Sequence, residues 1–195
     1  MRGRLITFEG GEACGKSTQA ALLARALGAV LTREPGGTRA GEQIRALLLD
    51  EPGTALAPRA EALLMAAARA QHVAEVVRPA LDAGRDVVSD RYAHSSLAYQ
   101  GYGRGLAVAE VAELSTWATE GLWPDLVILL DLPDDVALGR RGTPDRFESE
   151  AETFHRRVRQ GYRRLAAEEP ERWHVVDGFG SVEEVAARVW AAARP

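Results

Sequence analysis

This chain of 195 residues is poor in several features that mark particular classes of protein. Its single cysteine, Cys14, excludes a disulfide bond within the chain. It has no apolar run of transmembrane length and no segment typical of a signal peptide, so we expect a cytoplasmic protein without a membrane partner. The formal net charge of −4 argues against a broad basic face, and we expect no nucleic-acid polymer as a partner.

Lysine is almost missing, because Lys16 is the only lysine among the 24 lysine and arginine residues. A lysine kept at one position indicates that a compact ammonium group is needed there rather than a forked guanidinium. Lys16 lies in "GGEACGKS", in which Gly10 is followed by four residues and then by Gly15-Lys16-Ser17. This is the P-loop pattern, in which backbone N–H groups and a lysine bind phosphate groups.

The flanking sequence supports the P-loop. An apolar run, "LITFEG", precedes it and a helical pattern, "STQAALLARALG", follows it, as the phosphate-binding mechanism requires. We expect Lys16 to reach the β- and γ-phosphates and the Ser17 hydroxyl to ligate Mg²⁺, which predicts ATP and Mg²⁺ as cofactors. The residues predicted to bind the nucleotide are Gly10, Gly11, Glu12, Ala13, Cys14, Gly15, Lys16, Ser17 and Thr18.

The order of strand and helix patterns predicts the fold class. Five apolar runs indicate strands buried on both faces of a parallel sheet: "LITFEG", "AVLTRE", "DVVSDR", "LVILLDL" and "HVVDG". Helical patterns lie between them, over residues 17–27, 59–83, 108–120 and 151–168, with a last helix from residue 181. We therefore predict an α/β protein with a doubly wound five-stranded parallel sheet, a single domain over residues 1–195 and a lid segment at about 139–150.

The acidic strand ends narrow the functional class. A GTPase normally recognises guanine with Asn-Lys-x-Asp, which cannot occur here because Lys16 is the only lysine. A motor ATPase would have an acidic pair after a strand, whereas Asp131 is followed by Leu-Pro. Asp90 and Arg91 together suit a metal ligand and a phosphate clamp, which favours a small phosphotransfer kinase. A kinase for another small acceptor, or a nucleotide-dependent switch, remains the alternative.

Five segments, in this order, resemble the thymidylate kinase family across essentially the whole chain. They are "FEGGEACGKST", "REPGGTRAGEQIRALLL", "AAARAQHVAEVVRPAL", "DRYAHSSLAYQGYGRG" and "PDRFESEAETFHRRVRQGY". The resemblance implies transfer of the γ-phosphoryl group of ATP to thymidine monophosphate (dTMP), which gives thymidine diphosphate and ADP for dTTP synthesis. It also implies a homodimer. An apolar surface around Arg59 to Val77, with Leu63, Leu64 and Ala67 on it, is consistent with such an interface.

The resemblance also implies the residues that bind the acceptor. Glu12 should point away from the donor phosphates toward the sugar, because a carboxylate would repel them. Arg45 and Arg91 should hold the acceptor phosphate. Arg69 should donate to the thymine O4, and Met65, at a position where the family commonly has phenylalanine, should lie against the base or belong to the core. The other acceptor-binding residues so implied are Glu34, Ser95, Ser96, Tyr99 and Gln100, although Ser95 suits a helix cap equally well.

The resemblance places further catalytic charge in the lid. Some family members carry an arginine after the P-loop acid, whereas others supply the charge from the lid, and here the position is Ala13. We therefore expect Arg141 and Arg146 to act on the transferring phosphoryl group, with Arg140 nearby; a solvated charged loop is the alternative. The predicted catalytic residues are Lys16, Asp90, Arg91, Arg141 and Arg146, and the predicted metal ligands are Ser17 and Asp90.

Overall fold

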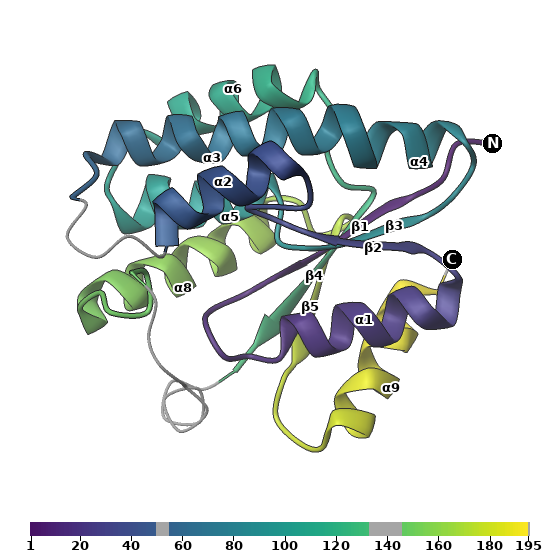
Figure 1. Ribbon diagram of the computed structural model, residues 1–195. Coiled ribbons are helices and arrows are strands. Elements are labelled where there is room, and N and C mark those ends of the chain that lie inside the picture. The colour runs from purple at the N-terminus through teal and green to yellow at the C-terminus, as the bar shows by residue number, and fades with distance from the viewer. Residues whose placement is uncertain (50–54, 133–145, 195) are drawn as a thin grey trace.

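The structure, a computed structural model, describes residues 1–49, 55–132 and 146–194. Five parallel strands form one sheet in the order β2-β3-β1-β4-β5, with helices on both sides (Figure 1). The strands are β1 (Leu5–Glu9), β2 (Val30–Arg33), β3 (Val87–Asp90), β4 (Leu126–Asp131) and β5 (Trp173–Asp177). The predicted fold class and all five predicted strands are confirmed.

The burial of each strand follows its position in the sheet. All five residues of the central strand β1 are buried, as expected for a strand covered on both faces. The edge strands β2 and β5 differ from the prediction of full burial, since Leu31 is 50% exposed and Val175 is 57% exposed. Helices cover these edges less completely, so apolar composition alone overestimates their burial.

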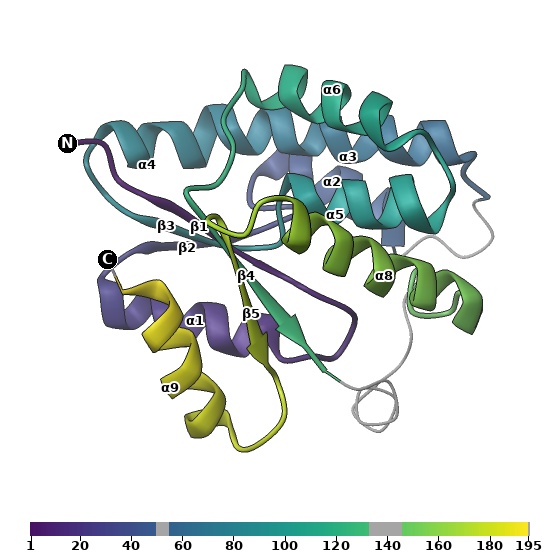
Figure 2. The same cartoon turned by 180° about the vertical axis from the view of Figure 1, so that it is seen from behind.

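Two groups of helices cover the sheet (Figures 1 and 2). Helices α1 and α9 lie on one face, and the remaining helices lie on the other. The α-helices are α1 (Lys16–Leu27), α2 (Arg39–Leu49), α3 (Pro58–His72), α4 (Arg78–Asp82), α5 (Ala93–Ser96), α6 (Val108–Thr119), α8 (Glu152–Glu168) and α9 (Val182–Ala193). Two π-helical segments, η1 (Val73–Val77) and η2 (Leu97–Gly103), continue α3 and α5.

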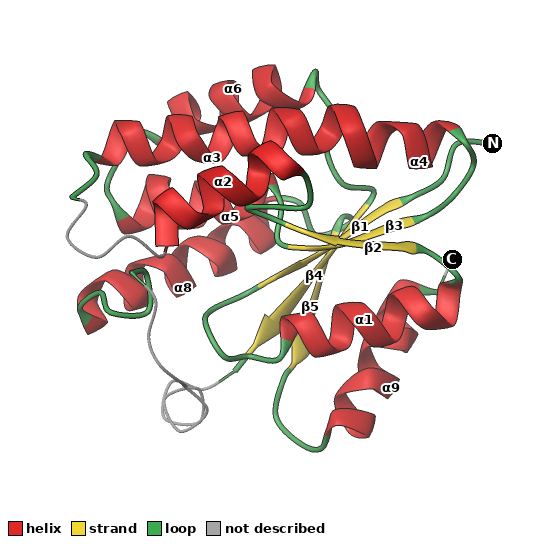
Figure 3. Ribbon diagram, viewed as in Figure 1, coloured by secondary structure: helices red, strands yellow, loops and turns green. Residues whose placement is uncertain are grey.

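The helices that the sequence predicts are present, with two differences (Figure 3). The segment predicted as one helix over 59–83 consists of α3, η1 and α4, so a π-helical turn interrupts its α-helical hydrogen bonding. The second difference is that α2 and the α5–η2 segment are absent from the predicted helices. The α5–η2 segment contains glycine and serine, which are poor helix formers, and it is stabilised instead by packing against α6 and α8.

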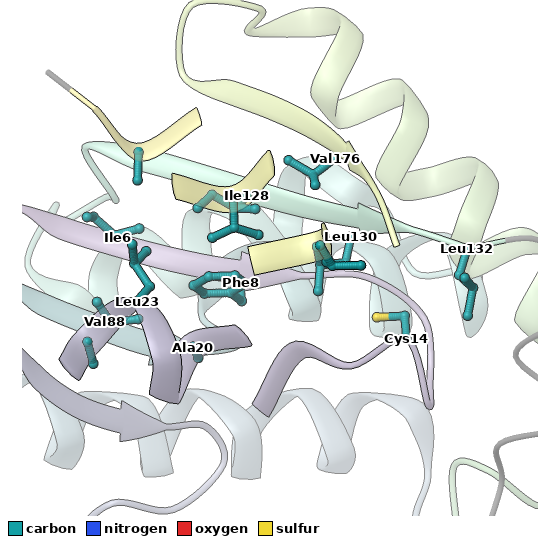
Figure 4. Close-up of a cluster of buried hydrophobic side chains, with 14 residues drawn as sticks. Ile6, Phe8, Cys14, Ala20, Leu23, Val88, Ile128, Leu130, Leu132 and Val176 are labelled. Atoms are coloured by element: carbon teal, nitrogen blue, oxygen red, sulfur yellow. The ribbon is translucent and has the colours of Figure 1, made fainter. Parts of the chain in front are cut away.

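The hydrophobic core forms two layers, one on each face of the sheet. Ile6, Phe8 and Ile128 pack between the sheet and helices α1 and α9, together with the buried thiol of Cys14 (Figure 4). A second layer, which includes Val127 and Tyr162, fills the space between the sheet and α8. Within the described ranges, no helix combines the length and apolarity that spanning a bilayer would require.

The sheet register brings the chemically important strand ends together. Phe8 and Arg33 are both paired with Asp90, so β1, β2 and β3 end at the same edge. The P-loop follows β1 directly at this edge. In open parallel sheets, ligands bind outside the carboxyl ends of the strands, and the functional site is expected there.

Candidate active site

A cavity of about 1000 Å³ lies at the carboxyl ends of β1, β2 and β3. Its walls come from the P-loop, from the segments that follow β2 and β3, and from α2, α3 and η2. The predicted site residues that line it are Glu12, Ala13, Gly15, Lys16, Ser17, Thr18, Glu34, Arg45, Met65, Arg69, Asp90, Arg91, Ser95, Ser96, Tyr99 and Gln100. The structure thus brings most of the predicted donor and acceptor residues to one site.

The P-loop backbone depends on glycine at its two ends. Gly10 has φ 141° and Gly15 has φ 93°, conformations that residues with a Cβ atom rarely adopt. A Cβ at Gly10 would also lie 2.6 Å from the Leu130 carbonyl oxygen. The Lys16 side chain is buried, and its ammonium donates to the Gly11 carbonyl at 2.6 Å. Lys16 begins α1, so a phosphate at this point would meet both the ammonium group and the helix N-terminus.

The two predicted metal ligands are in direct contact. The Ser17 hydroxyl donates to Asp90 Oδ2 at 2.5 Å. The other carboxylate oxygen, Oδ1, is buried and has no hydrogen-bond partner among the described residues. A hydroxyl beside a carboxylate with a free oxygen is a donor set that suits Mg²⁺, which keeps several waters and uses only one or two protein ligands. The residues present therefore fit the predicted ion.

Glu12 points out of the P-loop toward the segment that follows β3. Its Oε1 lies 2.7 Å from Arg91 Nη2 and also accepts a short hydrogen bond from the Tyr99 hydroxyl. Burial acts to raise the pKa of Glu12, but the charges of Arg91 and Lys16, together with the Tyr99 hydrogen bond, outweigh burial and lower the pKa to about 2. The carboxylate is therefore charged throughout the physiological range.

Arg91 connects the P-loop to the side of the cavity where the acceptor is predicted to bind. It follows Asp90 in a left-handed conformation, with φ 70°, which is uncommon for a residue with a side chain. Its guanidinium donates to the Gly10 carbonyl at 3.0 Å and to the hydroxyls of Ser95 and Tyr162 at 3.2 Å, besides its ion pair with Glu12. Although burial opposes the charge, Glu12 raises the pKa of Arg91 well above its usual value.

The sequence did not reveal the role of Glu9, the last residue of β1. Its carboxyl group is fully buried and accepts hydrogen bonds from the Tyr92 N–H at 3.0 Å, Ser95 at 2.6 Å and Tyr162 at 2.9 Å. Burial raises the pKa of Glu9 to about 7, because these donors and the nearby Arg91 only partly offset the loss of water. Ser95 lies inside α5, so it supports Glu9 and Arg91 rather than capping the helix.

A second buried carboxylate, Glu34, organises the side of the cavity nearer α3. It pairs with Arg69 Nε at 2.7 Å and with His72 Nδ1 at 2.9 Å, and His72 in turn contacts Thr32 at 2.6 Å. Burial would raise the pKa of Glu34, but the Arg69 charge and the His72 contact outweigh it, and the pKa is lowered. His72 thus has a structural role, because it connects Glu34 to Thr32.

These contacts restrict how Arg69 can bind a ligand. Its Nη2 donates to the Tyr92 carbonyl at 3.3 Å and to Ser96 at 3.0 Å, in addition to the Nε contact with Glu34. Only Nη1, whose contact with Ser115 is 3.5 Å long, has donor capacity left for a base. Met65 is half-buried and lines the same cavity, so its side chain is available to a ligand as well as to the core.

The end of the predicted lid is held on α3. Arg146 Nη2 lies 2.8 Å from Glu61 Oε2, and Arg146 Nε donates to the Leu48 carbonyl at 2.6 Å. In this arrangement Arg146 faces Glu61 and does not line the cavity, in contrast to its predicted contact with the phosphoryl group. Arg140 and Arg141 lie outside the described residues.

The remaining predicted residues have local roles. Arg45 is half-buried and donates to the Pro35 carbonyl at 2.9 Å, which directs its guanidinium along the cavity wall. Gly10 and Gly11 shape the P-loop behind the cavity surface. The Cys14 side chain is only 3% exposed and packs in the core (Figure 4), which favours a small structural filler over a reactive thiol.

Among the residues that sequence reasoning missed are Phe147, which lines the cavity, and Glu9 and Tyr162, which contact Arg91 or its neighbours behind the cavity wall. Phe147 is buried, lines the cavity and lies edge-on to Tyr99 with ring centroids 5.5 Å apart. An aromatic residue in the otherwise charged stretch "GRRGTPDRFESE" was a usable signal for Phe147. Tyr162 lies far along the chain on α8, and only the tertiary packing shows its contacts with Glu9 and Arg91.

Comparison with known proteins agrees with this geometry. The family model described as thymidylate kinase matches residues 8–189. The thymidylate kinase of Leifsonia xyli subsp. xyli is 56% identical over 196 residues, covering 96% of this chain and 92% of that protein. The thymidylate kinase of Thermomicrobium roseum is 52% identical over 195 residues, which cover 95% of this chain and 92% of that protein. The crystal structure of thymidylate kinase from Ehrlichia chaffeensis superposes with a TM-score of 0.84 at 31% identity, over 100% of both chains.

Proposed function

Because this chain belongs to the thymidylate kinase family, we propose that it transfers the γ-phosphoryl group of ATP to dTMP, giving thymidine diphosphate and ADP. The observation that carries the proposal is the adjacency of two contacts across one cavity. Ser17 meets Asp90 on the donor side, and Glu12 meets Arg91 on the acceptor side. We also propose one kinase domain over residues 1–195 with a lid at about 139–150. The cytoplasmic location stays a prediction.

On the donor side, the P-loop N–H groups and Lys16 would bind the phosphates of ATP. Ser17 and Asp90 would hold Mg²⁺, which would supply positive charge to offset that of the phosphates. Lys16 is positioned for this role because its ammonium is buried at the start of α1 and can exchange its contact with the Gly11 carbonyl for a phosphate oxygen.

On the acceptor side, Arg91 and Arg45 would hold the dTMP phosphate. An oxygen of this phosphate forms the new bond to the γ-phosphorus while the bond from that phosphorus to the β–γ bridging oxygen breaks, and the leaving oxygen remains on ADP. Arg91 stays protonated throughout, and the Gly10 carbonyl, Ser95 and Glu12 fix its guanidinium. The residues act mainly by positioning and charge.

The sugar and the base would occupy the part of the cavity nearer α3 and η2. Tyr99, next to Glu12, would lie against the deoxyribose, and Glu12 would accept from its 3′-hydroxyl. Ser96, Gln100 and Arg69 would meet the polar edge of thymine. Met65 would lie against its ring, while Glu34 would support Arg69 from behind.

The two lid arginines can be tested separately. We propose that Arg141 acts on the phosphoryl group, and that Arg146 could do so only after leaving Glu61. Arg141→Ala and Arg146→Ala would then differ, with one of them losing on the order of 10³-fold in kcat, the scale of a transition-state arginine. If both variants keep kcat within a few-fold, the proposed role of the lid is wrong.

The apolar surface of α3 supports a homodimer. Leu63 on α3 is 58% exposed, and Trp117 on the neighbouring helix α6 is 81% exposed. Large apolar side chains exposed on neighbouring helices are a feature of interfaces, and a twin copy of the same helices would form a symmetric one. Analytical ultracentrifugation should show a dimer at micromolar concentration, which Trp117→Glu should weaken.

An acceptor screen tests the central proposal. Purified protein with ATP and Mg²⁺ should form ADP rapidly with dTMP and slowly with the monophosphates of other nucleosides. ADP formation that another monophosphate stimulates better would identify a different small-acceptor kinase. ADP formation that no acceptor stimulates would indicate a nucleotide-dependent switch instead.

A further inference from the structure

We propose that Glu61 is a positioning residue for base selection, because it fixes the orientation of the Gln100 side-chain amide. Glu61 lies in the first turn of α3, and Gln100 lies in η2 and lines the cavity. The proposal rests on the proposed function, since it concerns how a pyrimidine acceptor is chosen. It extends that function to a residue that does not itself line the cavity.

The Glu61 carboxyl group is paired with two guanidinium groups. It is fully buried, and the guanidinium of Arg104 contacts both of its oxygens, at 3.0 to 3.2 Å. Arg146 Nη2 lies 2.8 Å from Oε2. Two guanidinium groups at such distances stabilise the ionised form of a buried acid. An ionised carboxylate accepts hydrogen bonds and donates none.

The chemistry of Glu61 therefore decides which end of the Gln100 amide faces it. Gln100 Nε2 donates to Glu61 Oε1 at 2.8 Å. The reverse orientation would bring the amide oxygen against a carboxylate oxygen, with no proton between them. Gln100 is 1% exposed and lines the cavity, and because Nε2 is bound to Glu61, Oε1 is the end of the amide that remains for a ligand. This oxygen is a fixed acceptor at the cavity wall.

A fixed acceptor selects for a ring that presents an N–H group. Thymine and uracil carry a proton on N3, whereas N3 of neutral cytosine is itself an acceptor. A buried amide oxygen facing an acceptor would lose its hydrogen bond and gain repulsion, and mismatches of this kind discriminate strongly. Gln100 therefore recognises N3 of the base, while Arg69 would recognise O4.

Replacing Glu61 by glutamine should reverse the Gln100 amide. The oxygen of the new amide should take the Oε2 position, because Arg104 Nη2 donates there and the positively charged Arg146 guanidinium lies 2.8 Å away. Its NH₂ group would then face Gln100, which must turn its own oxygen inward and present NH₂ to the cavity. We expect the ratio of kcat/KM for dTMP to kcat/KM for dCMP to fall by at least about tenfold in Glu61→Gln.

Two matched variants separate orientation from general disturbance. Glu61→Asp keeps an acceptor-only group and should keep the dTMP/dCMP ratio within about threefold, even if its overall kcat/KM falls. Glu150→Gln makes the same chemical change one contact away, because Glu150 pairs with Arg104 and does not touch Gln100. It should also keep the ratio. An unchanged ratio in Glu61→Gln, or an equal loss in all three variants, would overturn the proposal.

A spectroscopic measurement on the wild-type protein does not depend on recovering the variants. The Gln100 side-chain NH₂ protons should be protected from solvent exchange both without and with dTMP, since they face Glu61 in both states. Protection that arises only with dTMP would show that the amide turns toward the base, and would contradict the inference. Wild-type protein that does not phosphorylate dTMP would refute the proposed function itself, which the acceptor screen detects independently.

Discussion

Glu9 and Glu12 lie three residues apart at the end of β1, yet their surroundings shift their pKa values in opposite directions. Glu9 accepts hydrogen bonds from three uncharged donors, and although the charge of nearby Arg91 also acts to lower its pKa, burial raises the pKa to about 7. Glu12 faces the charges of Arg91 and Lys16, and its pKa is lowered to about 2. Both acids are deeply placed, so burial alone does not decide the outcome. A formal positive charge in contact compensates for lost water, whereas neutral donors do so only in part.

The largest expected effect comes from removing one of the cations beside Glu12. Lys16→Ala should lower kcat by on the order of 10³-fold or more, because the ammonium would offset charge on the migrating phosphoryl group. The melting temperature should change little, since Lys16 supports no core cluster. Steady-state kinetics and thermal melting measure both effects. Near-normal turnover in the folded variant would show that the donor site is wrongly assigned.

The two acids themselves offer a matched pair of variants. Glu12→Gln should reduce kcat/KM for dTMP by about 10²-fold, because Arg91 would lose its charged partner and the acceptor phosphate would lose its alignment. Glu9→Gln should cost less than tenfold, since a neutral amide still accepts from Ser95 and Tyr162. Equal losses in the two variants would mean that charge is not what distinguishes these sites.

The pH dependence of stability should separate the same two variants. The native state keeps a proton on Glu9 up to about pH 7, whereas the unfolded chain loses it near the ordinary value of 4.5. Stability therefore falls as pH rises from about 4.5 through 7, by on the order of 3 kcal/mol if the shift is fully expressed. Glu9→Gln should remove this fall and gain stability relative to wild type between pH 5 and pH 8.

Glu12→Gln is the control for that measurement. The pKa of Glu12 is lowered, so its contribution to stability is present above 4.5 and is lost only as pH falls toward 2. Urea denaturation should therefore show a nearly constant difference between Glu12→Gln and wild type from pH 5 to pH 8. A Glu9→Gln difference that is equally constant would mean that Glu9 is already ionised at pH 5.

The smallest effect is expected at Tyr162, which contacts both Glu9 and Arg91, the ion-pair partner of Glu12. The Tyr162 hydroxyl donates to Glu9 at 2.9 Å and lies 3.2 Å from Arg91 Nη1. Tyr162→Phe should lower kcat/KM by a few-fold and raise the pKa of Glu9 further, because one donor is lost. The same urea series would show the stability decline moved to higher pH. A decline that stays in place would mean that Ser95 and Tyr92 alone support Glu9.

The sequence was most informative where function depends on consecutive residues. The P-loop, its strand and its helix could be predicted because Gly10, Gly15, Lys16 and Ser17 act through local backbone geometry. The apolar runs likewise predicted the sheet, since each strand carries its own pattern.

The sequence was least informative where a residue acts through distant partners. Glu61 resembles an ordinary acid in the first turn of a helix, and only the packing of η2 and residue 146 against it shows its contacts. Similarly, Glu9 reads as one more residue of an apolar strand until Tyr162 on α8 reaches it. The π-helical turn in η1 is also a tertiary effect, because residues 59–83 carry a continuous α-helical pattern.

The left-handed backbone at Arg91 has a consequence for how the two substrates meet. Asp90 contacts Ser17 on the side where ATP is proposed to bind, and the very next residue, Arg91, contacts Glu12 on the side proposed for the acceptor. The separation between the residue proposed to hold the metal ion, Asp90, and the residue proposed to hold the acceptor phosphate, Arg91, is therefore set by one peptide unit. Its two Cα atoms are about 3.8 Å apart. Covalent geometry, which thermal motion hardly changes, would thus limit how far the donor and acceptor phosphates can drift from one another.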